Sequence, residues 1–175
     1  MKDIIVARTD TLYGILAPAG DQYAVEYIYT LKGRDHDKPF IILISSIDQL
    51  LKFGITLSEI HYKYIDDYWP GPYSLIFDID SSFSKDLYYP HRGTNTLAFR
   101  LPNDTQVIRL IDQMEGAVVA PSCNPQGQIP ASTITQAKEY FGNQINHYID
   151  GGLVEQIKPS SVMRIHYDGA IEQLR

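Results

Sequence analysis

The chain has 175 residues, of which 44% are hydrophobic, and this suits one domain with a single core. Its formal net charge of −6 disfavours a protein that binds nucleic acid through a broad basic surface, because that mode needs many lysine and arginine contacts to phosphates. The single cysteine cannot form an internal disulfide, and no apolar run approaches the ~20 residues that span a bilayer, so we expect a cytoplasmic protein without a membrane segment.

The first half of the chain alternates strands and helices. Residues 3–8 are β-branched and precede a polar turn, which predicts a buried strand followed by a loop over residues 9–14. The next apolar positions recur at helical spacing, with Asp21 as the N-cap and Gly33 as the stop. The further elements expected here are a strand at residues 40–44, a helix at 46–53 capped by Ser46 and ended by Gly54, and a helix at 58–68.

The second half continues the same alternation. The rigid turn WPGP at residues 69–72 ends the preceding helix. The elements expected after it are strands at 73–79 and 96–101 separated by a loop at 81–95, a helix at 104–116, a strand at 117–120, a helix at 132–141, and strands at 145–149, 161–166 and 170–174. No repeat or linker interrupts this order, so we predict one α/β domain over residues 1–175 with a mixed sheet flanked by helices.

Two polar clusters follow directly on buried strands. They are Thr9-Asp10-Thr11 after the first strand and Ser122 with Asn124 after the strand at residues 117–120. Because ligands of open α/β sheets bind outside the carboxyl ends of the strands, we expect these clusters to share one site.

A third cluster is basic and places Lys32, Arg34 and Lys38 within seven residues. Such cations can surround a polyphosphate, and the helix stop at Gly33 predicts that Lys32 and Arg34 lie at an exposed helix end. The alternative is that they favour the helix dipole and are neutralised by Asp35 and Asp37. Neither G-x-x-x-x-G-K-[ST] nor G-x-G-x-x-G occurs, so any ATP site is of another kind.

The sequence offers no nucleophile and no structural metal. Ser122 lacks the G-x-S-x-G context, and Cys123 has no assignable histidine partner. The five histidines have no partners at zinc-ligand spacing.

In order along the chain, these clusters resemble the YrdC/TsaC family of threonylcarbamoyl-AMP synthases. The blocks that carry the resemblance are RTDTLYG at residues 8–14, KGR and DKP within 32–39, WPGP at 69–72, TLAFRLP at 96–102, APSCNPQG at 120–127, DGG at 150–152, PSSV at 159–162 and LR at 174–175. The resemblance covers almost the whole chain. It implies a twisted mixed sheet with a concave ligand-binding face.

The function that the resemblance implies is that of a nucleotidyltransferase. It would make threonylcarbamoyl-AMP and pyrophosphate from L-threonine, bicarbonate and ATP with Mg²⁺, for the t6A modification of tRNA. Further partners implied are tRNA or the downstream threonylcarbamoyl-transfer complex, with the protein a monomer or homodimer.

The family's site residues carry over by motif position. The residues implied for ATP are Lys32, Arg34, Lys38, Thr96, Ser122, Asn124 and Arg175, with Lys32 and Arg34 in the catalytic role. Those implied for threonine are Thr9, Arg100, Ala120, Ser160 and Ser161, with the Arg100 guanidinium on the carboxylate. Two alternatives stay open: Arg100 can be a structural arginine paired across the sheet, and Arg175 can fray.

The chain departs from the family pattern at Arg8, Cys123 and Gln126, where proline, alanine and serine are usual. Arg8 would add a cation next to the site or mark a changed substrate. Two other functions are therefore weighed. A carbamoyl-adenylate-forming paralogue would lack a threonine site, and a double-stranded RNA or tRNA binder is disfavoured by the acidic balance.

Overall fold

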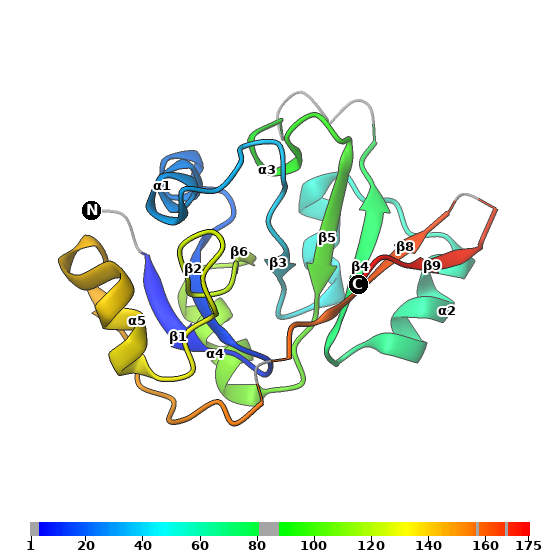
Figure 1. Cartoon of the computed structure of the whole chain (residues 1–175). Coiled ribbons are helices and arrows are strands. Elements are labelled where there is room, and N and C mark those ends of the chain that lie inside the picture. The colour runs from blue at the N-terminus through cyan, green and yellow to red at the C-terminus, as the bar shows by residue number, and fades with distance from the viewer. Residues whose placement is uncertain (1–3, 81–87, 157, 167) are drawn as a thin grey trace.

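A mixed β-sheet runs through the molecule. The computed structural model describes residues 4–80, 88–156, 158–166 and 168–175. The strands are β1 (Ile5–Arg8), β2 (Tyr13–Pro18), β3 (Ile42–Leu43), β4 (Tyr73–Asp78), β5 (Thr96–Arg100), β6 (Val118–Val119), β7 (His147–Tyr148), β8 (Ser161–Ile165) and β9 (Ile171–Gln173). They lie in the order β7-β1-β2-β6-β3-β5-β4-β8-β9 (Figure 1). β1 pairs antiparallel with β2, whereas β3 and β5 are parallel, so the predicted mixed sheet is confirmed.

Helices flank this sheet. They are α1 (Gln22–Lys32), α2 (Glu59–Tyr68), α3 (Tyr88–His91), α4 (Thr105–Gln113) and α5 (Ile134–Phe141), with 3₁₀ turns η1 (Ile47–Phe53) and η2 (Gly142–Gln144). In Figure 1, α1 and α5 lie beside β1, and α2 lies near the other end of the sheet, beside β8 and β9. Among the described residues no helix has the length and apolar character to cross a membrane.

Side-chain alternation along β1 and β2 divides the core between two faces of the sheet. Val6 and Ile15 belong to the larger apolar cluster, whereas Ala7 and Leu16 join a smaller one with Val107 of α4. Because successive strand residues point to opposite faces, both faces of these strands are covered. This part of the sheet is therefore an interior layer.

The local stop and start signals behave as predicted. The Asp21 carboxylate accepts a hydrogen bond from the Ala24 backbone N–H at 3.0 Å, and Gly33 ends α1 in the left-handed region with φ of 59°. Asp104 caps α4 in the same manner. Gly54 also ends its helix with positive φ, but that helix is 3₁₀ and Ser46 makes no side-chain capping bond.

The predicted loop over residues 9–14 is wrong at its end, because Tyr13 and Gly14 begin β2. Strand β2 is buried on both faces along almost its whole length, so its sequence shows no alternation of polar and apolar residues. The predicted loop at 81–95 also contains a helical turn, α3; residues 81–87 lie outside the described residues.

Candidate functional site

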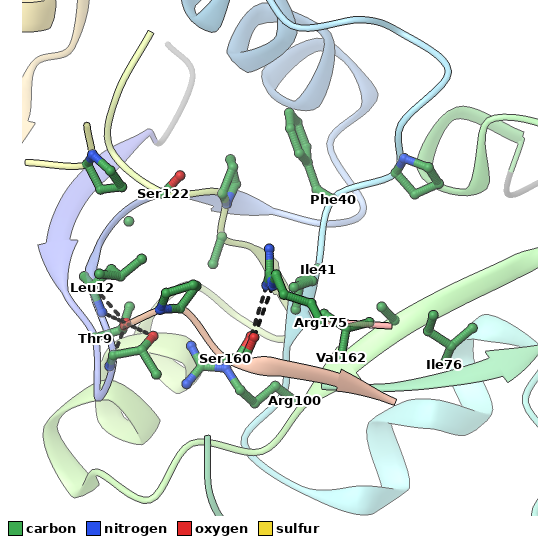
Figure 2. Close-up of a pocket in the computed structure, with 18 of the residues that line it drawn as sticks. Thr9, Leu12, Phe40, Ile41, Ile76, Arg100, Ser122, Ser160, Val162 and Arg175 are labelled. Carbon is green, nitrogen blue, oxygen red and sulfur yellow. Dashed lines mark hydrogen bonds between the residues drawn. The ribbon is translucent and has the colours of Figure 1, made fainter. Parts of the chain in front are cut away.

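One cavity of about 700 Å³ opens beside the β1–β2 loop and extends over β5 and β8 (Figure 2). The predicted site residues on its wall are Thr9, Arg34, Thr96, Arg100, Ala120, Ser122, Ser160 and Arg175. The loops of Thr9 and Ser122 meet there, since Gly14 forms a β-bridge with Ser122. Members of both predicted polar clusters therefore lie on the wall of one cavity.

The charged side chains on the described wall are all arginines: Arg34, Arg100 and Arg175. None of the described lining residues is acidic, although the whole chain carries a net charge of −6. Burial, and then repulsion from Arg34 and Arg100, lowers the pKa of Arg175. A cavity of this kind is suited to an anionic ligand.

Arg175 is anchored by Ser160. Its Nε donates to the Ser160 backbone oxygen at 3.1 Å and its Nη2 lies 3.4 Å from Ser160 Oγ, as the dashed lines in Figure 2 show. The Ser160 hydroxyl also bonds the buried Ser74 hydroxyl on β4 at 2.9 Å. These bonds favour a held Arg175 over the alternative in which it frays.

Arg100 lies on β5 with only 5% of its side chain exposed, and its Nη1 forms an ion pair with the Asp10 carboxylate. Burial lowers the pKa of Arg100, and the Asp10 charge opposes that shift. The pair joins the strand to the β1–β2 loop. Arg100 thus has an ion-pair partner, as a structural arginine would, but the partner lies in the β1–β2 loop and not across the sheet. Arg100 also lines the cavity.

Thr9 uses its hydroxyl to shape the β1–β2 loop. The oxygen donates to the Leu12 backbone oxygen at 2.7 Å and accepts from the Leu12 backbone N–H at 3.2 Å (Figure 2). Thr11 approaches the same oxygen through both its backbone N–H and its hydroxyl. Thr9 therefore stabilises the loop that faces the cavity, and Thr11 adds a hydroxyl residue to the wall.

Lys32 is buried, which corrects the prediction of an exposed helix end. The residue is 4% exposed, and its ammonium donates to the backbone oxygens of Ser122 and Asn124, the latter at 2.6 Å. It also lies 3.4 Å from Asn124 Oδ1. Burial lowers the pKa of Lys32 to about 8. Lys32 is absent from the described cavity wall and holds the loop that carries Ser122.

Asn124 is the second support of this loop. Its Oδ1 accepts from the Ser122 hydroxyl at 2.6 Å, and its Nδ2 donates to the Gln128 backbone oxygen at 2.8 Å. Asn124 is thus buried behind Ser122 and does not appear on the described wall. Ser122 therefore lies at the surface of the site, and the side chains of Lys32 and Asn124 support its loop from beneath.

Lys38 lies outside the described cavity wall and forms an exposed ion pair with Asp35 at 2.6 Å. The Asp35 backbone N–H also donates to Gln126 Oε1 at 3.1 Å. Local neutralisation, the alternative reading of the basic cluster, therefore holds for Lys38. Arg34 is half-buried and reaches the cavity, with its guanidinium carbon 5.3 Å from the centre of the Phe40 ring.

The remaining predicted residues divide by position. Ala120 and Thr96 line the cavity, and the Thr96 hydroxyl bonds that of Thr94 at 3.2 Å. Ser161 does not appear on the described wall, and its backbone N–H bonds Pro72. Polar lining residues that the sequence analysis did not assign include Thr11 and Thr94. Thr11 lay within a motif already singled out, so its position was a usable signal.

The departures from the family pattern lie around the site. Arg8 is not among the residues on the described cavity wall and donates to the Gly151 backbone oxygen at 2.9 Å, so it adds no cation to that wall. Cys123 is fully buried, which raises the pKa of its thiol to about 12. Gln126 bonds Asp35 and thereby connects the loop after Ser122 with the loop after α1.

Comparisons with known proteins show the family and the fold to which this chain is similar. The family described as "Sua5_yciO_yrdC: Telomere recombination" matches residues 2–175. A threonylcarbamoyl-AMP synthase of Marinobacter nauticus is 30% identical over 93% of this chain and 84% of its own length. The synthase of Pyrococcus abyssi is 32% identical over 85% of this chain and 43% of its own, so the chain spans about half of that relative.

A solved structure gives the same relationship. The crystal structure of P. abyssi Sua5 complexed with L-threonine superimposes with a TM-score of 0.87 and 29% identity, over 98% of this chain and 49% of that one. The resemblance noted in the sequence is thereby confirmed, and so is the predicted fold class. With the family match extending over residues 2–175, this chain belongs to the Sua5/YciO/YrdC family.

Proposed function

We propose that this chain forms threonylcarbamoyl-AMP and pyrophosphate from L-threonine, bicarbonate and ATP. The observation that carries the proposal is the convergence of Arg34, Arg100 and Arg175 on a cavity without acidic residues on its described wall. The reaction brings a carboxylate, a carbamate and a polyphosphate together, so negative charge must be neutralised at one place. The names of the two relatives support the same reaction.

The chemistry needs no covalent bond to the protein. The threonine amine nitrogen bonds to the carbon of bicarbonate, and water leaves to give a carbamate. A carbamate oxygen then attacks the α-phosphorus of ATP, the bond to the β-phosphate bridging oxygen breaks, and pyrophosphate leaves. The protein contributes by positioning the reactants and neutralising charge. A Cys123 thiol with a pKa of about 12 is unsuited to act as a nucleophile.

In this proposal each substrate takes its own part of the wall. Arg100 and Ser160, beside the Thr9 loop, would take the threonine carboxylate and hydroxyl. Arg34 and Ser122 would take the phosphates. Lys32 and Asn124 act on the phosphates through the position of Ser122. In this assignment Arg34 is the residue of the KGR block (residues 32–34, the K-x-R motif) that contacts the phosphates directly.

Magnesium would enter with ATP. No described lining residue is a carboxylate, and the described residues hold no group of three His, Cys, Asp or Glu side chains suited to a metal. Mg²⁺ takes oxygen ligands and keeps several waters, so phosphate oxygens and water would complete its shell. The ion would thus neutralise phosphate charge as part of the bound nucleotide.

The test measures pyrophosphate release from ATP with Mg²⁺ and bicarbonate, in the presence of L-threonine, without it, and with L-serine instead. The proposed synthase requires both L-threonine and bicarbonate. Release that is indifferent to threonine would favour the carbamoyl-adenylate alternative, and no release would reject the enzyme assignment.

Matched arginine variants connect that activity to the cavity. Arg34→Ala should reduce pyrophosphate release, whereas Arg109→Ala should not, because Arg109 is exposed on α4 and is not among the residues on the described wall. Equal activity of the two variants would contradict the placement of the phosphates at Arg34.

A further inference from the structure

Asp10 occupies an unusual position relative to the cavity. Its side chain is 10% exposed, and it is absent from the described wall, yet its carboxylate pairs with Arg100, which is on that wall. Within the described residues Asp10 is the one hydrogen-bond partner of the Arg100 guanidinium, and Arg100 Nε is buried without a partner. A single carboxylate therefore holds this buried cation.

The loop that carries Asp10 is itself held by local hydrogen bonds. Thr9 closes the turn through its hydroxyl and also through a backbone hydrogen bond from its N–H to the Leu12 oxygen at 2.8 Å. In Figure 2 the Arg100 guanidinium points toward this Thr9 loop, below Ser160. Local bonds thus close the loop that carries the carboxylate, and its partner Arg100 lies 90 residues further along the chain.

We infer that Asp10 is a positioning residue for carboxylate recognition: by holding Nη1 of Arg100, it turns another edge of the guanidinium toward the substrate carboxylate. This inference rests on the proposed function. A guanidinium has five donors in a fixed planar fork, so fixing one nitrogen fixes the directions of the others. An Asp10 without direct contact to substrate acts on threonine only through Arg100.

A purely structural ion pair is the competing explanation. Buried ion pairs often contribute little net stability, because the desolvation of both charges offsets their attraction. The two explanations predict different results in binding experiments. A positioning role predicts a selective loss of carboxylate recognition, whereas a structural role predicts a general loss of binding.

The decisive variant is Asp10→Asn, which keeps an acceptor oxygen and the side-chain size but removes the charge. Its matched control is Asp78→Asn, because Asp78 pairs with Arg164 at 2.6 Å on the protein surface. Calorimetric titrations would compare L-threonine, ATP and L-threoninol, which has the threonine side chain and amine without the carboxylate.

In Asp10→Asn the dissociation constant of L-threonine should rise by about tenfold to a hundredfold, the loss expected for one hydrogen bond to a charged group. Those of ATP and L-threoninol should change by less than about twofold, within ordinary scatter of such comparisons. The Asp78→Asn control should match the wild type. An equal loss for all three ligands, or no loss for threonine, would overturn the inference.

A second readout needs no substrate. Phenylglyoxal modifies accessible arginines, and peptide mass spectrometry would follow Arg100, Arg34 and Arg175 separately. Asp10→Asn should speed labelling of Arg100 alone, and an unchanged rate at Arg100 would reject the positioning role. Wild-type protein that binds no threonine would instead refute the proposed function, while the labelling would still decide whether Asp10 holds Arg100.

Discussion

Replacing Lys32 with methionine removes a buried ammonium while keeping most of the side-chain volume. The ammonium donates to two backbone oxygens and lies near Asn124 Oδ1, and hydrogen bonds from a charged donor contribute about 1.5 kcal/mol or more each. Against this, burial lowers the lysine pKa from 10.5 to about 8, which corresponds to a desolvation cost of about 3 kcal/mol. With the contact to Asn124 Oδ1 counted as a third bond, the three bonds contribute about 4.5 kcal/mol, and the difference predicts a loss of about 1–2 kcal/mol in the free energy of unfolding.

The assay is urea denaturation of Lys32→Met, followed by an ATP titration of the folded variant. Because Lys32 holds the loop of Ser122, ATP affinity should fall by about tenfold, and pyrophosphate release should fall with it. The control is Lys63→Met, since Lys63 is exposed on α2. An unchanged unfolding free energy together with unchanged ATP affinity would refute the supporting role assigned to Lys32.

Three further predictions follow from the same contacts. The folded pKa of Lys32, about 8, lies below its unfolded value of 10.5, so the unfolded chain binds more protons between these values. The unfolding free energy of the wild type should therefore rise with pH in that interval relative to Lys32→Met, and parallel pH curves from denaturation would contradict this. Arg34→Ala should weaken ATP binding by about tenfold or more without lowering the urea midpoint, because the one hydrogen bond of its side chain to the described residues, to the Lys38 backbone oxygen, is long at 3.4 Å. Cys123, with a pKa of about 12, should resist iodoacetamide in the native protein at pH 8 and react after unfolding, as mass spectrometry would report; rapid native labelling would contradict the buried site.

The gap between expectation and structure is clearest at the K-x-R motif. The sequence placed three cations together, which predicted that they can surround a polyphosphate and that Lys32 and Arg34 lie at an exposed helix end. The structure separates them: Arg34 faces the cavity, Lys32 is buried beneath Ser122, and Lys38 pairs with Asp35 at the surface. Spacing along a chain gives no information about the direction in which each side chain leaves a helix end and its loop.

Strand β2 illustrates a second limit. Alternation reveals a strand only when one face is solvated, and Tyr13–Pro18 is covered on both. The same burial positions the Tyr13 hydroxyl to bond the Gly152 backbone oxygen at 2.8 Å. A segment that anchors the site was therefore assigned in part to a loop.

The sequence by itself determined two kinds of feature: those that depend on neighbouring residues, and those that depend on several motifs taken together. Asp21, Asp104 and Gly33 act on backbone groups a few residues away, so their capping roles could be predicted from neighbours alone. The family could be identified from the order of the motif blocks along the chain, which also needs no knowledge of the fold. The Asp10–Arg100 and Lys32–Asn124 contacts join residues 90 and 92 positions apart, and only the order of strands brings them together. Tertiary structure decided which motif residues face the cavity, because burial and long-range partners depend on the packing of the entire sheet.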